Sequence, residues 1–189
     1  MPQFNGWNIV LLDSQARSEP RTLATFSSVG MKPRWSLDGK WIAFDAYEAE
    51  HGIDLSTGGH PAELWMIQIE TGQLKRLTTN TYLDSSPSFS PDGTQLAYVS
   101  EQYANGYPRI HTMDHATGES RLITPDQYGY DPIWSPDGKW IAFEKYLHTD
   151  QEIPYIEVPT VYIVRADGAY AQSVSLDRAS TENFIEWQP

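Results

Sequence analysis

The sequence of 189 residues contains no cysteine. This absence excludes disulfides, thiolate metal ligands and cysteine nucleophiles. The sequence also lacks an apolar run of about 18 residues, the minimum for a membrane-spanning helix. Its first residues do not combine a basic segment with an apolar run, as secretory signal peptides do. We therefore expect no membrane insertion and no export signal in this sequence.

Basic residues are scarce, since 13 Lys and Arg stand against 25 Asp and Glu, for a net charge of −12. A surface with this charge repels phosphate backbones, so we expect no nucleic-acid partner. Proteins, peptides, basic groups and cations are the compatible ligands. Hydrophobic residues make up 40% of the chain and aromatic residues 13%, which is enough for a folded core. The length fits one domain over 1–189.

One pattern occurs three times, at 33–44, 87–98 and 132–143. Each copy contains a Ser-Pro-Asp-Gly or Ser-Leu-Asp-Gly segment between two apolar stretches. Proline presets φ, aspartate hydrogen-bonds the local backbone and glycine adopts positive φ, so this segment suits a tight hairpin. We therefore predict that Asp38, Asp92 and Asp137 form turns and are neither ligands nor catalysts.

Two further strand-like segments follow the first two copies, and one follows the third. A repeat of about 40 to 45 residues with four short strands is typical of a β-propeller blade. The sequence therefore predicts an all-β fold, a β-propeller of four-stranded antiparallel blades. We place the blades at about 32–80, 85–125 and 130–176, with strands of a further blade at 7–27 and 184–189.

The terminal strands allow three assemblies. The chain can close a small four-bladed ring, complete a larger ring as a homo-oligomer, or form part of a longer propeller. We favour the part of a longer propeller, because the segment 184–189 stops in the middle of the repeated motif and its apolar strand needs a partner.

The repeats resemble the WD-like propeller repeat of the TolB family. They share its Trp-Ser-Pro-Asp-Gly and Ile-Ala-Phe segments, its Leu-Trp hairpin ending in Thr-Gly and its Leu-Thr strand. They depart from it at Leu37, which replaces the turn proline, and at His111, where the other units have Trp65 and Tyr162. The resemblance implies a non-enzymatic part of the Tol-Pal envelope system that binds a lipoprotein. It implies a periplasmic location if a signal peptide is missing from this sequence, and a cytoplasmic one otherwise.

Two long connections distinguish the blades, at 45–62 and 144–160. They should share one face with the blade-to-blade links, which contain Asp84, Asp126, Tyr128, Tyr130 and Asp131. Because loops carry most binding functions, we predict an acidic, tyrosine-rich rim that binds a protein or peptide partner. The candidate partner-binding residues are Tyr47, Glu48, His51, Asp54, His60, Tyr146, His148 and Asp150.

The same connections contain residues of types that bind divalent cations. They are His51, Asp54 and His60 in one connection, and His148, Asp150 and Glu152 in the other. Their spacing matches no closed metal-site motif, so we expect neither a metal nor another cofactor. For His111 and His115 we expect structural hydrogen bonds.

The sequence contains no Gly-x-Ser-x-Gly elbow and no glycine-rich phosphate loop, so we do not expect an enzyme. Two enzymatic alternatives stay open. One is a metal-dependent, polysaccharide-acting enzyme that resembles the oligogalacturonate lyase propellers. The other is the propeller part of a peptidase.

Overall fold

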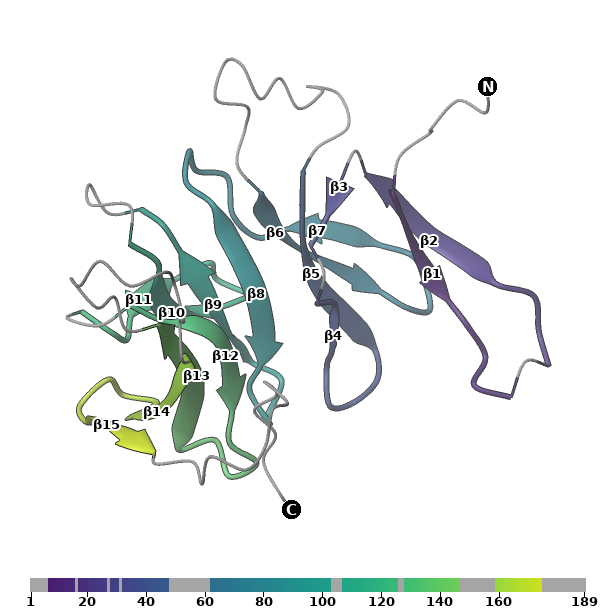
Figure 1. The fold of residues 1–189 in the computed structure, drawn as a ribbon. Helices are drawn as coiled ribbons and strands as arrows, with labels where there is room; N and C mark the ends of the chain where they lie inside the picture. Colours follow the sequence, from purple (N-terminus) through teal and green to yellow (C-terminus); the bar gives the residue numbers. More distant parts are fainter. Residues whose placement is uncertain are drawn as a thin grey trace.

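A computed structural model describes residues 7–15, 17–26, 28–30, 32–47, 62–102, 107–125, 128–146 and 159–174. Regular structure in these ranges is β-strand throughout, arranged as small sheets that fan out side by side (Figure 1). No helix in the described part of the chain is long and apolar enough to cross a membrane.

The strands form three antiparallel blades and an N-terminal hairpin. The hairpin pairs β1 (Trp7–Leu11) with β2 (Arg21–Phe26). Blade 1 contains β3 (Ser28–Val29), β4 (Arg34–Trp35), β5 (Trp41–Tyr47), β6 (Glu63–Gln68) and β7 (Leu74–Arg76). Blade 2 contains β8 (Asp84–Phe89), β9 (Gln95–Ser100), β10 (Arg109–Asp114) and β11 (Ser120–Leu122). Blade 3 contains β12 (Tyr130–Trp134), β13 (Trp140–Tyr146), β14 (Pro159–Arg165) and β15 (Ala171–Val174).

The predicted fold class is confirmed, because each blade is an antiparallel sheet whose strands pair in chain order. In blade 1 the first strand is split, so that β3 and β4 pair with successive parts of β5. The predicted strand at 184–189 lies outside the described residues.

The predicted Asp-Gly hairpins are present in all three blades. In blade 2, Ser90 Oγ donates to Asp92 Oδ1 over 2.6 Å, and the amide of Thr94 donates to the same oxygen over 3.0 Å. Hydrogen bonds, first from Ser90 and then from Thr94, lower the pKa of Asp92. Gly93 closes the turn at φ +72°, a conformation that side chains with a Cβ disfavour. Asp38 and Asp137 make the same contacts, which confirms their turn role.

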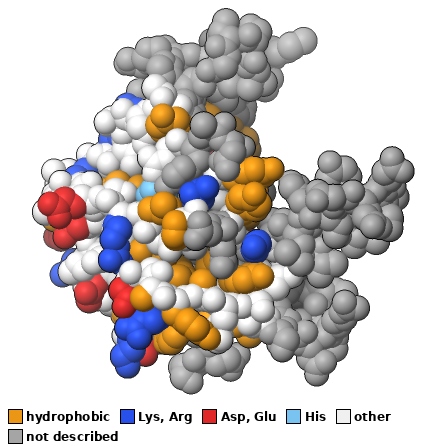
Figure 2. Space-filling model, turned by 90° about the vertical axis from the view of Figure 1, so that its left-hand side faces the viewer, with side chains coloured by type: hydrophobic (Ala, Val, Ile, Leu, Met, Phe, Trp, Pro, Cys, Tyr) orange, Lys and Arg blue, Asp and Glu red, His pale blue; other side chains and the backbone are white. Residues whose placement is uncertain are grey.

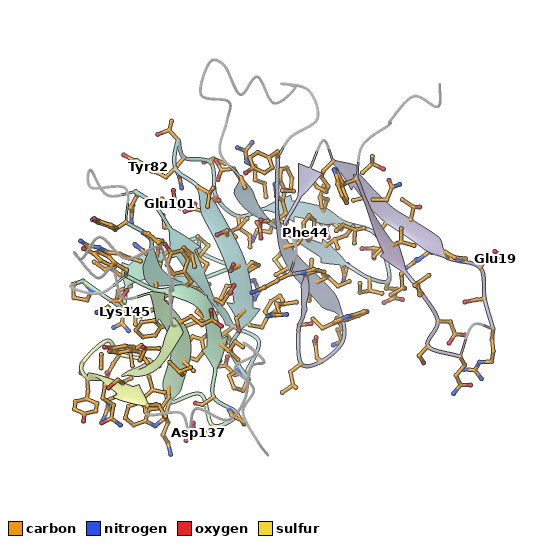
Figure 3. All side chains as sticks on the ribbon, in the orientation of Figure 1. Glu19, Phe44, Tyr82, Glu101, Asp137 and Lys145 are labelled. Carbon is orange, nitrogen blue, oxygen red and sulfur yellow. The ribbon has the colours of Figure 1, made fainter. Side chains whose placement is uncertain are left out.

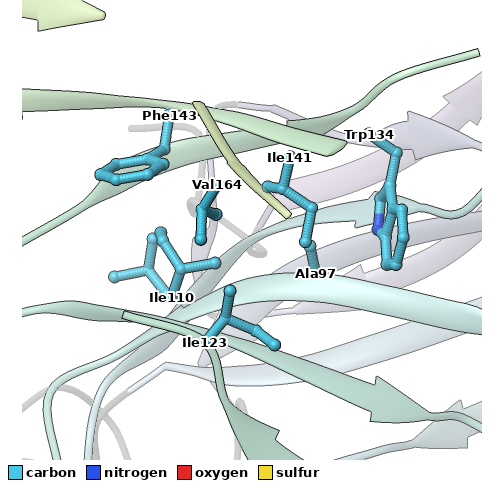
Figure 4. Close-up of a cluster of buried hydrophobic side chains, with 8 residues drawn as sticks. Ala97, Ile110, Ile123, Trp134, Ile141, Phe143 and Val164 are labelled. Atoms are coloured by element: carbon cyan, nitrogen blue, oxygen red, sulfur yellow. The ribbon is translucent and has the colours of Figure 1, made fainter. Parts of the chain in front are cut away.

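Apolar side chains on both faces of each sheet pack the blades together. Alternation along β13 directs Ile141 and Phe143 toward blade 2. Figure 4 shows the resulting cluster between blades 2 and 3. Its members are Ala97, Val99, Ile110, Ile123, Trp134, Ile141, Phe143 and Val164. On the other side of the molecule, Phe26 of the hairpin packs edge-on against Phe44 and Trp65, with ring centroids 5.3 and 5.2 Å apart.

The aromatic residue that precedes each Asp-Gly turn differs in burial between the blades. Phe89 and Trp134 are 9% and 8% exposed, because each is covered by the preceding blade. Trp35 is 52% exposed. On its side of blade 1, the described residues supply only the two strands of the hairpin, which leave this tryptophan uncovered.

A basic side chain on the outer strand of the hairpin, of blade 1 and of blade 2 contacts the next blade. Lys75 Nζ of blade 1 donates to the His115 carbonyl of blade 2 over 2.5 Å, and Arg121 Nη2 of blade 2 donates to the Ala166 carbonyl of blade 3 over 2.6 Å. Arg21 of the hairpin donates in the same way to the Ile69 carbonyl of blade 1. These three contacts, which we call the carbonyl clamps, occupy equivalent positions of the repeat and join neighbouring sheets.

We predict that Gly93→Val lowers the free energy of unfolding by about 1–2 kcal/mol, because valine disfavours the left-handed conformation. No described atom lies within 4 Å of a Cβ built at Gly93, so steric clash adds nothing. Gly93→Asn is the matched control, since asparagine tolerates positive φ. Urea denaturation measures both variants, and equal losses for valine and asparagine would contradict this account of the turn.

Candidate partner-binding face

The blades have two ends with different connections. One end, the turn face, holds the short hairpin turns at 36–40, 90–94 and 135–139. The opposite end, the link face, holds the connections between second and third strands and the links between blades. Figure 3 labels Tyr82 and Glu101 at the link face and Asp137 at the turn face.

The second strands of blades 1 and 3 extend further than the sequence predicted. Asp45 and Glu144 were expected to begin long connections, but both lie inside strands and pair with Leu64 and Val161. The ladder with the third strand continues to Ala46 in blade 1 and to Tyr146 in blade 3, and β5 and β13 end at Tyr47 and Tyr146 on the link face. The ladder continues because the third strands begin early enough to supply partners.

Most of the predicted partner-binding residues lie outside the described residues. Tyr47 is half-buried and pairs with Ser28 in blade 1, whereas Tyr146 pairs with Pro159 in blade 3. The undescribed ones are Glu48, His51, Asp54, His60, His148 and Asp150, and the proposed metal ligand Glu152 is undescribed as well. Within the described ranges, no three His, Asp or Glu side chains are grouped as metal ligands.

Tyrosines from several connections lie at the link face. Tyr107 follows the second strand of blade 2, and Tyr128 lies in the link to blade 3. Their rings stack with centroids 4.0 Å apart and planes 25° apart. Tyr82, in the link between blades 1 and 2, is 43% exposed. Tyrosine side chains therefore come to this face from the connection within blade 2 and from the links on both sides of it.

A polar cluster joins the first strands of the blades, and we call it the inner cluster: Lys32, Asp45, Ser86 and Asp131. The amide of Ser86 donates to Asp45 Oδ1 over 3.2 Å, and Ser86 Oγ donates to Asp131 Oδ1 over 3.1 Å. Lys32 forms an ion pair with Asp131. Blade 1 is thus connected to blade 2 through Asp45, and to blade 3 through Lys32.

The backbone has an unusual conformation at two residues of the inner cluster. Ser86 and Asp131 adopt φ of 53° and 48°, an uncommon region for residues with a Cβ, and the strand register shifts at both sites. Gly30 is required beside the cluster, since a Cβ there would lie 1.8 Å from Asp45 Oδ2. Burial raises the pKa of Asp45, and the negative charge of Asp131 acts in the same direction.

A second buried polar group lies between blades 1 and 2. Asp84, which was expected on an acidic rim, is fully buried, and Asn80 Nδ2 donates to its Oδ2 over 2.6 Å. Glu63 is buried and pairs with Arg76 over 3.2 Å. Burial raises the pKa of both carboxyl groups. Asp84 therefore belongs to the blade interface, because its amide also donates to the Ala62 carbonyl.

The sequence prediction missed Lys32, Ser86 and Glu63. Lys32 and Ser86 had a recognisable signal, because a polar residue precedes the first proline of every repeat, as Asp131 does in the third. Glu63 had no such signal in the sequence, since a single acid at the start of a predicted strand is common in a chain with 25 acidic residues.

The two histidines expected to be structural do form local contacts. His111 is 3% exposed, and its Nε2 lies 2.9 Å from Gln102 Nε2. Burial, followed by the charge of Arg109, lowers the pKa of His111 to about 4. His115 Nε2 lies 2.7 Å from the Gly93 carbonyl.

Comparison with known families gives one matching family model, described as the TolB beta propeller domain, over residues 51–166. The Tol-Pal system protein TolB of Francisella tularensis subsp. holarctica (strain OSU18) is 30% identical over 157 residues. That match covers 83% of this chain and 31% of the relative, so the chain spans about a third of the relative's length.

Solved structures with similar folds include TolB from Acinetobacter baumannii, with a TM-score of 0.67 and 23% identity over 89% of this chain and 37% of that one. An oligogalacturonate lyase in complex with manganese gives a TM-score of 0.62 and 18% identity, over 94% of this chain and 44% of the lyase. Both likenesses establish the propeller fold of this chain and nothing about its activity.

We predict that His111 makes the protein less stable as the pH falls from 7 to 5. The folded pKa of about 4 is below the ordinary value of 6.5, so the unfolded chain takes up the proton first. The expected loss in the free energy of unfolding is about 1–2 kcal/mol.

The variant His111→Tyr, which introduces the residue that blade 3 has at this position, should lack this loss. Urea denaturation at both pH values measures it. The buried carboxyl groups contribute in the opposite direction, because their raised pKa favours the folded state at lower pH. Both proteins share this contribution, so it cancels when the variant's change in the free energy of unfolding is subtracted from that of the wild type. An identical pH dependence in the two proteins would contradict the prediction.

Proposed function

The chain belongs to the TolB β-propeller domain family, and from this premise we propose that it is a non-enzymatic scaffold that binds a protein partner at its link face. The observation that carries the proposal is the presence of tyrosines on this face in the connection within blade 2 and in both of its links, with the stacked pair of Tyr107 and Tyr128 among them. Tyrosine is enriched at protein interfaces, because it combines a large apolar ring with a polar end.

The binding rim that we propose is acidic as well as aromatic. Tyr47 and Tyr146 end strands at the link face, so the long connections that follow them start there. We propose that the rim consists of Tyr47, Glu48, His51, Asp54, His60, Tyr146, His148 and Asp150. The inner cluster supports the proposed rim, because its hydrogen bonds and ion pair connect the three blades.

The names of the relatives guide the choice of partner. Several of them are named as Tol-Pal system proteins, so we propose a protein partner in the bacterial envelope and a periplasmic location. We propose no cofactor, no nucleic-acid partner and no membrane insertion for the described propeller. A second copy of the chain that completes the ring is a further proposed partner.

Affinity for the purified lipoprotein partner of a Tol-Pal system tests the rim. We expect the combined variant Tyr47→Ala, His51→Ala, Tyr146→Ala and His148→Ala to weaken binding at least tenfold in biolayer interferometry, because two aromatic anchors are lost. The matched control changes four exposed residues of the turn face to alanine, namely Lys40, Gln73, Lys139 and Tyr170. Unchanged binding by the rim variant, or an equal loss in the control, would show that the rim is misplaced.

Thermal unfolding with metals distinguishes the non-enzymatic scaffold from a metal-dependent enzyme that resembles the manganese-bound lyase. We expect the same Tm in EDTA and in excess Mn²⁺, Ca²⁺ or Zn²⁺. A specific site would instead stabilise the protein by about 2.7 kcal/mol at a hundredfold excess over Kd. A rise in Tm that His51→Ala and His148→Ala abolish would favour the metal-dependent enzyme.

A further inference from the structure

Acidic side chains on the surface have nearby donors and bases that stabilise their charge. Figure 2 shows one side of the molecule, where acidic side chains gather toward the left edge and Lys and Arg side chains lie beside them. Hydrogen bonds, first from the Ala169 amide and then from Arg165, lower the pKa of the surface residue Asp167. Two acids in the interior, Glu63 and Asp84, have a different environment.

Glu63 and Asp84 lie in the contact between blades 1 and 2, and each has one oxygen that lacks a hydrogen-bond donor. Their exposed fractions are 4% and 0%. Glu63 Oε2 and Asp84 Oδ1 have no hydrogen-bond partner among the described residues. Leaving a buried carboxylate oxygen unpaired costs free energy, so ionising both acids together is unfavourable.

One positive charge serves these two acids. Arg76 Nη2 donates to Glu63 Oε1 over 3.2 Å, and its charge favours the ionised form of Glu63. In the described part of the chain, no positive charge acts on Asp84 in this way, and its hydrogen-bond partners are the neutral side chains of Ser100, Asn80 and Thr78. Of the two acids, Asp84 is therefore the one that holds a proton more easily.

The Thr78 hydroxyl connects the two acids. Burial raises the pKa of both, and hydrogen bonding to Thr78 opposes this shift in each, but the hydroxyl has one hydrogen and can donate to only one acid at a time. Thr78 Oγ1 also accepts from the Leu64 amide over 3.0 Å. A proton on Asp84 removes the competition, because protonated Asp84 can donate to Thr78 Oγ1 while Thr78 donates to Glu63.

The fold does not require a carboxyl group at position 84. The same position of the repeat is glycine in the other two blades, at Gly30 and Gly129. The main-chain contact with the preceding blade is the same with either residue. The Asp84 amide donates to the Ala62 carbonyl over 2.9 Å, and the Gly129 amide donates to the Pro108 carbonyl over 3.0 Å. Asp84 therefore adds a titratable group to a contact that forms without one.

Other ionisable side chains lie on the elements packed around Asp84. They are Asp45 on β5, Glu63 on β6, Arg76 on β7, Glu101 after β9, and Arg109 and His111 on β10. Asp45 accepts from the Ser86 amide, and the charge of Arg109 acts on His111. Burial alone raises the pKa of Glu101. The variants used below keep all of these groups, so their titration contributes equally to each protein.

We propose that Asp84 is a proton-dependent contact between blades 1 and 2, which is stable while Asp84 holds a proton and weakens when Asp84 ionises. Ionised Asp84 needs water at Oδ1, and water reaches this oxygen only when the contact opens. The opening extends to the link face, because Asn80 Nδ2 donates to Asp84 Oδ2 and Asn80 Oδ1 accepts from the Tyr82 amide over 2.7 Å. The proposal does not depend on what binds at that face.

The direction of the pH effect follows from the burial of Asp84. Because burial raises its pKa in the folded protein above the ordinary value of 3.8, the folded state takes up the proton first. The stability that this proton contributes is present at low pH and is lost as the pH rises through the raised pKa. His111 acts in the opposite direction, so the effect of Asp84 is measured as a difference between proteins.

Hydrogen exchange of the Asp84 amide tests the proposal in the full chain, because this amide donates to the Ala62 carbonyl across the contact. Between pH 5 and pH 8, we expect its protection factor to fall at least tenfold further in the wild type than in Asp84→Asn, which cannot ionise. A tenfold difference corresponds to about one pH unit between the pKa of the closed and the open state. An equal fall in the two proteins would overturn the proposal.

The matched control is Asp92→Asn, which removes one acid from a surface turn. Its protection factor should fall as in the wild type, within twofold. If Asp92→Asn removes the pH dependence as Asp84→Asn does, overall charge causes it and the proposal is wrong.

A titration of the wild type needs no variant. NMR of the side-chain carboxyl carbons should give Asp84 a midpoint at least one pH unit above that of Asp92, whose pKa is lowered by hydrogen bonds from Ser90 and Thr94. Equal midpoints for the two aspartates would also overturn the proposal.

Discussion

Stacking of sheets that are apolar on both faces is the constraint on which this structure depends. Along β5, Ile42 and Phe44 pack toward the hairpin, while Ala43 packs toward blade 2. A single blade would expose both of these surfaces to water, so each blade depends on its neighbours for stability. The inner cluster and the carbonyl clamps add directional contacts between the blades, which apolar contacts alone do not supply.

Polar contacts serve different purposes at the two ends of the blades. At the turn face they are local, as between Ser90 and Asp92, and they shape one hairpin each. Near the first strands they are long-range, as between Ser86 and Asp131, and they connect different blades. A partner on the link face would therefore meet a platform whose blades are joined beneath it.

The sequence predicts the local part of this structure well. The fold class and the Asp-Gly turns follow from residues within a few positions of one another, and Asp38, Asp92 and Asp137 make the predicted contacts. The repeat marks the positions of Lys32, Ser86 and Asp131, but the contacts among them could not be predicted, because Lys32 and Asp131 are 99 positions apart. The burial of Asp84 could not be predicted either, because a buried acid and an exposed acid look alike in sequence. Asp84 is an interior residue because the adjacent blade covers it.

The carbonyl clamps have a consequence for how such chains can diversify. Each clamp ends on a main-chain oxygen, so the accepting position is occupied by isoleucine, histidine and alanine in turn, at Ile69, His115 and Ala166. A blade can therefore change its side chain there without losing the neighbour's arginine or lysine. Duplicated blades can drift apart in sequence and still stack in the same way, and this leaves the contacts between them free to acquire different chemistry.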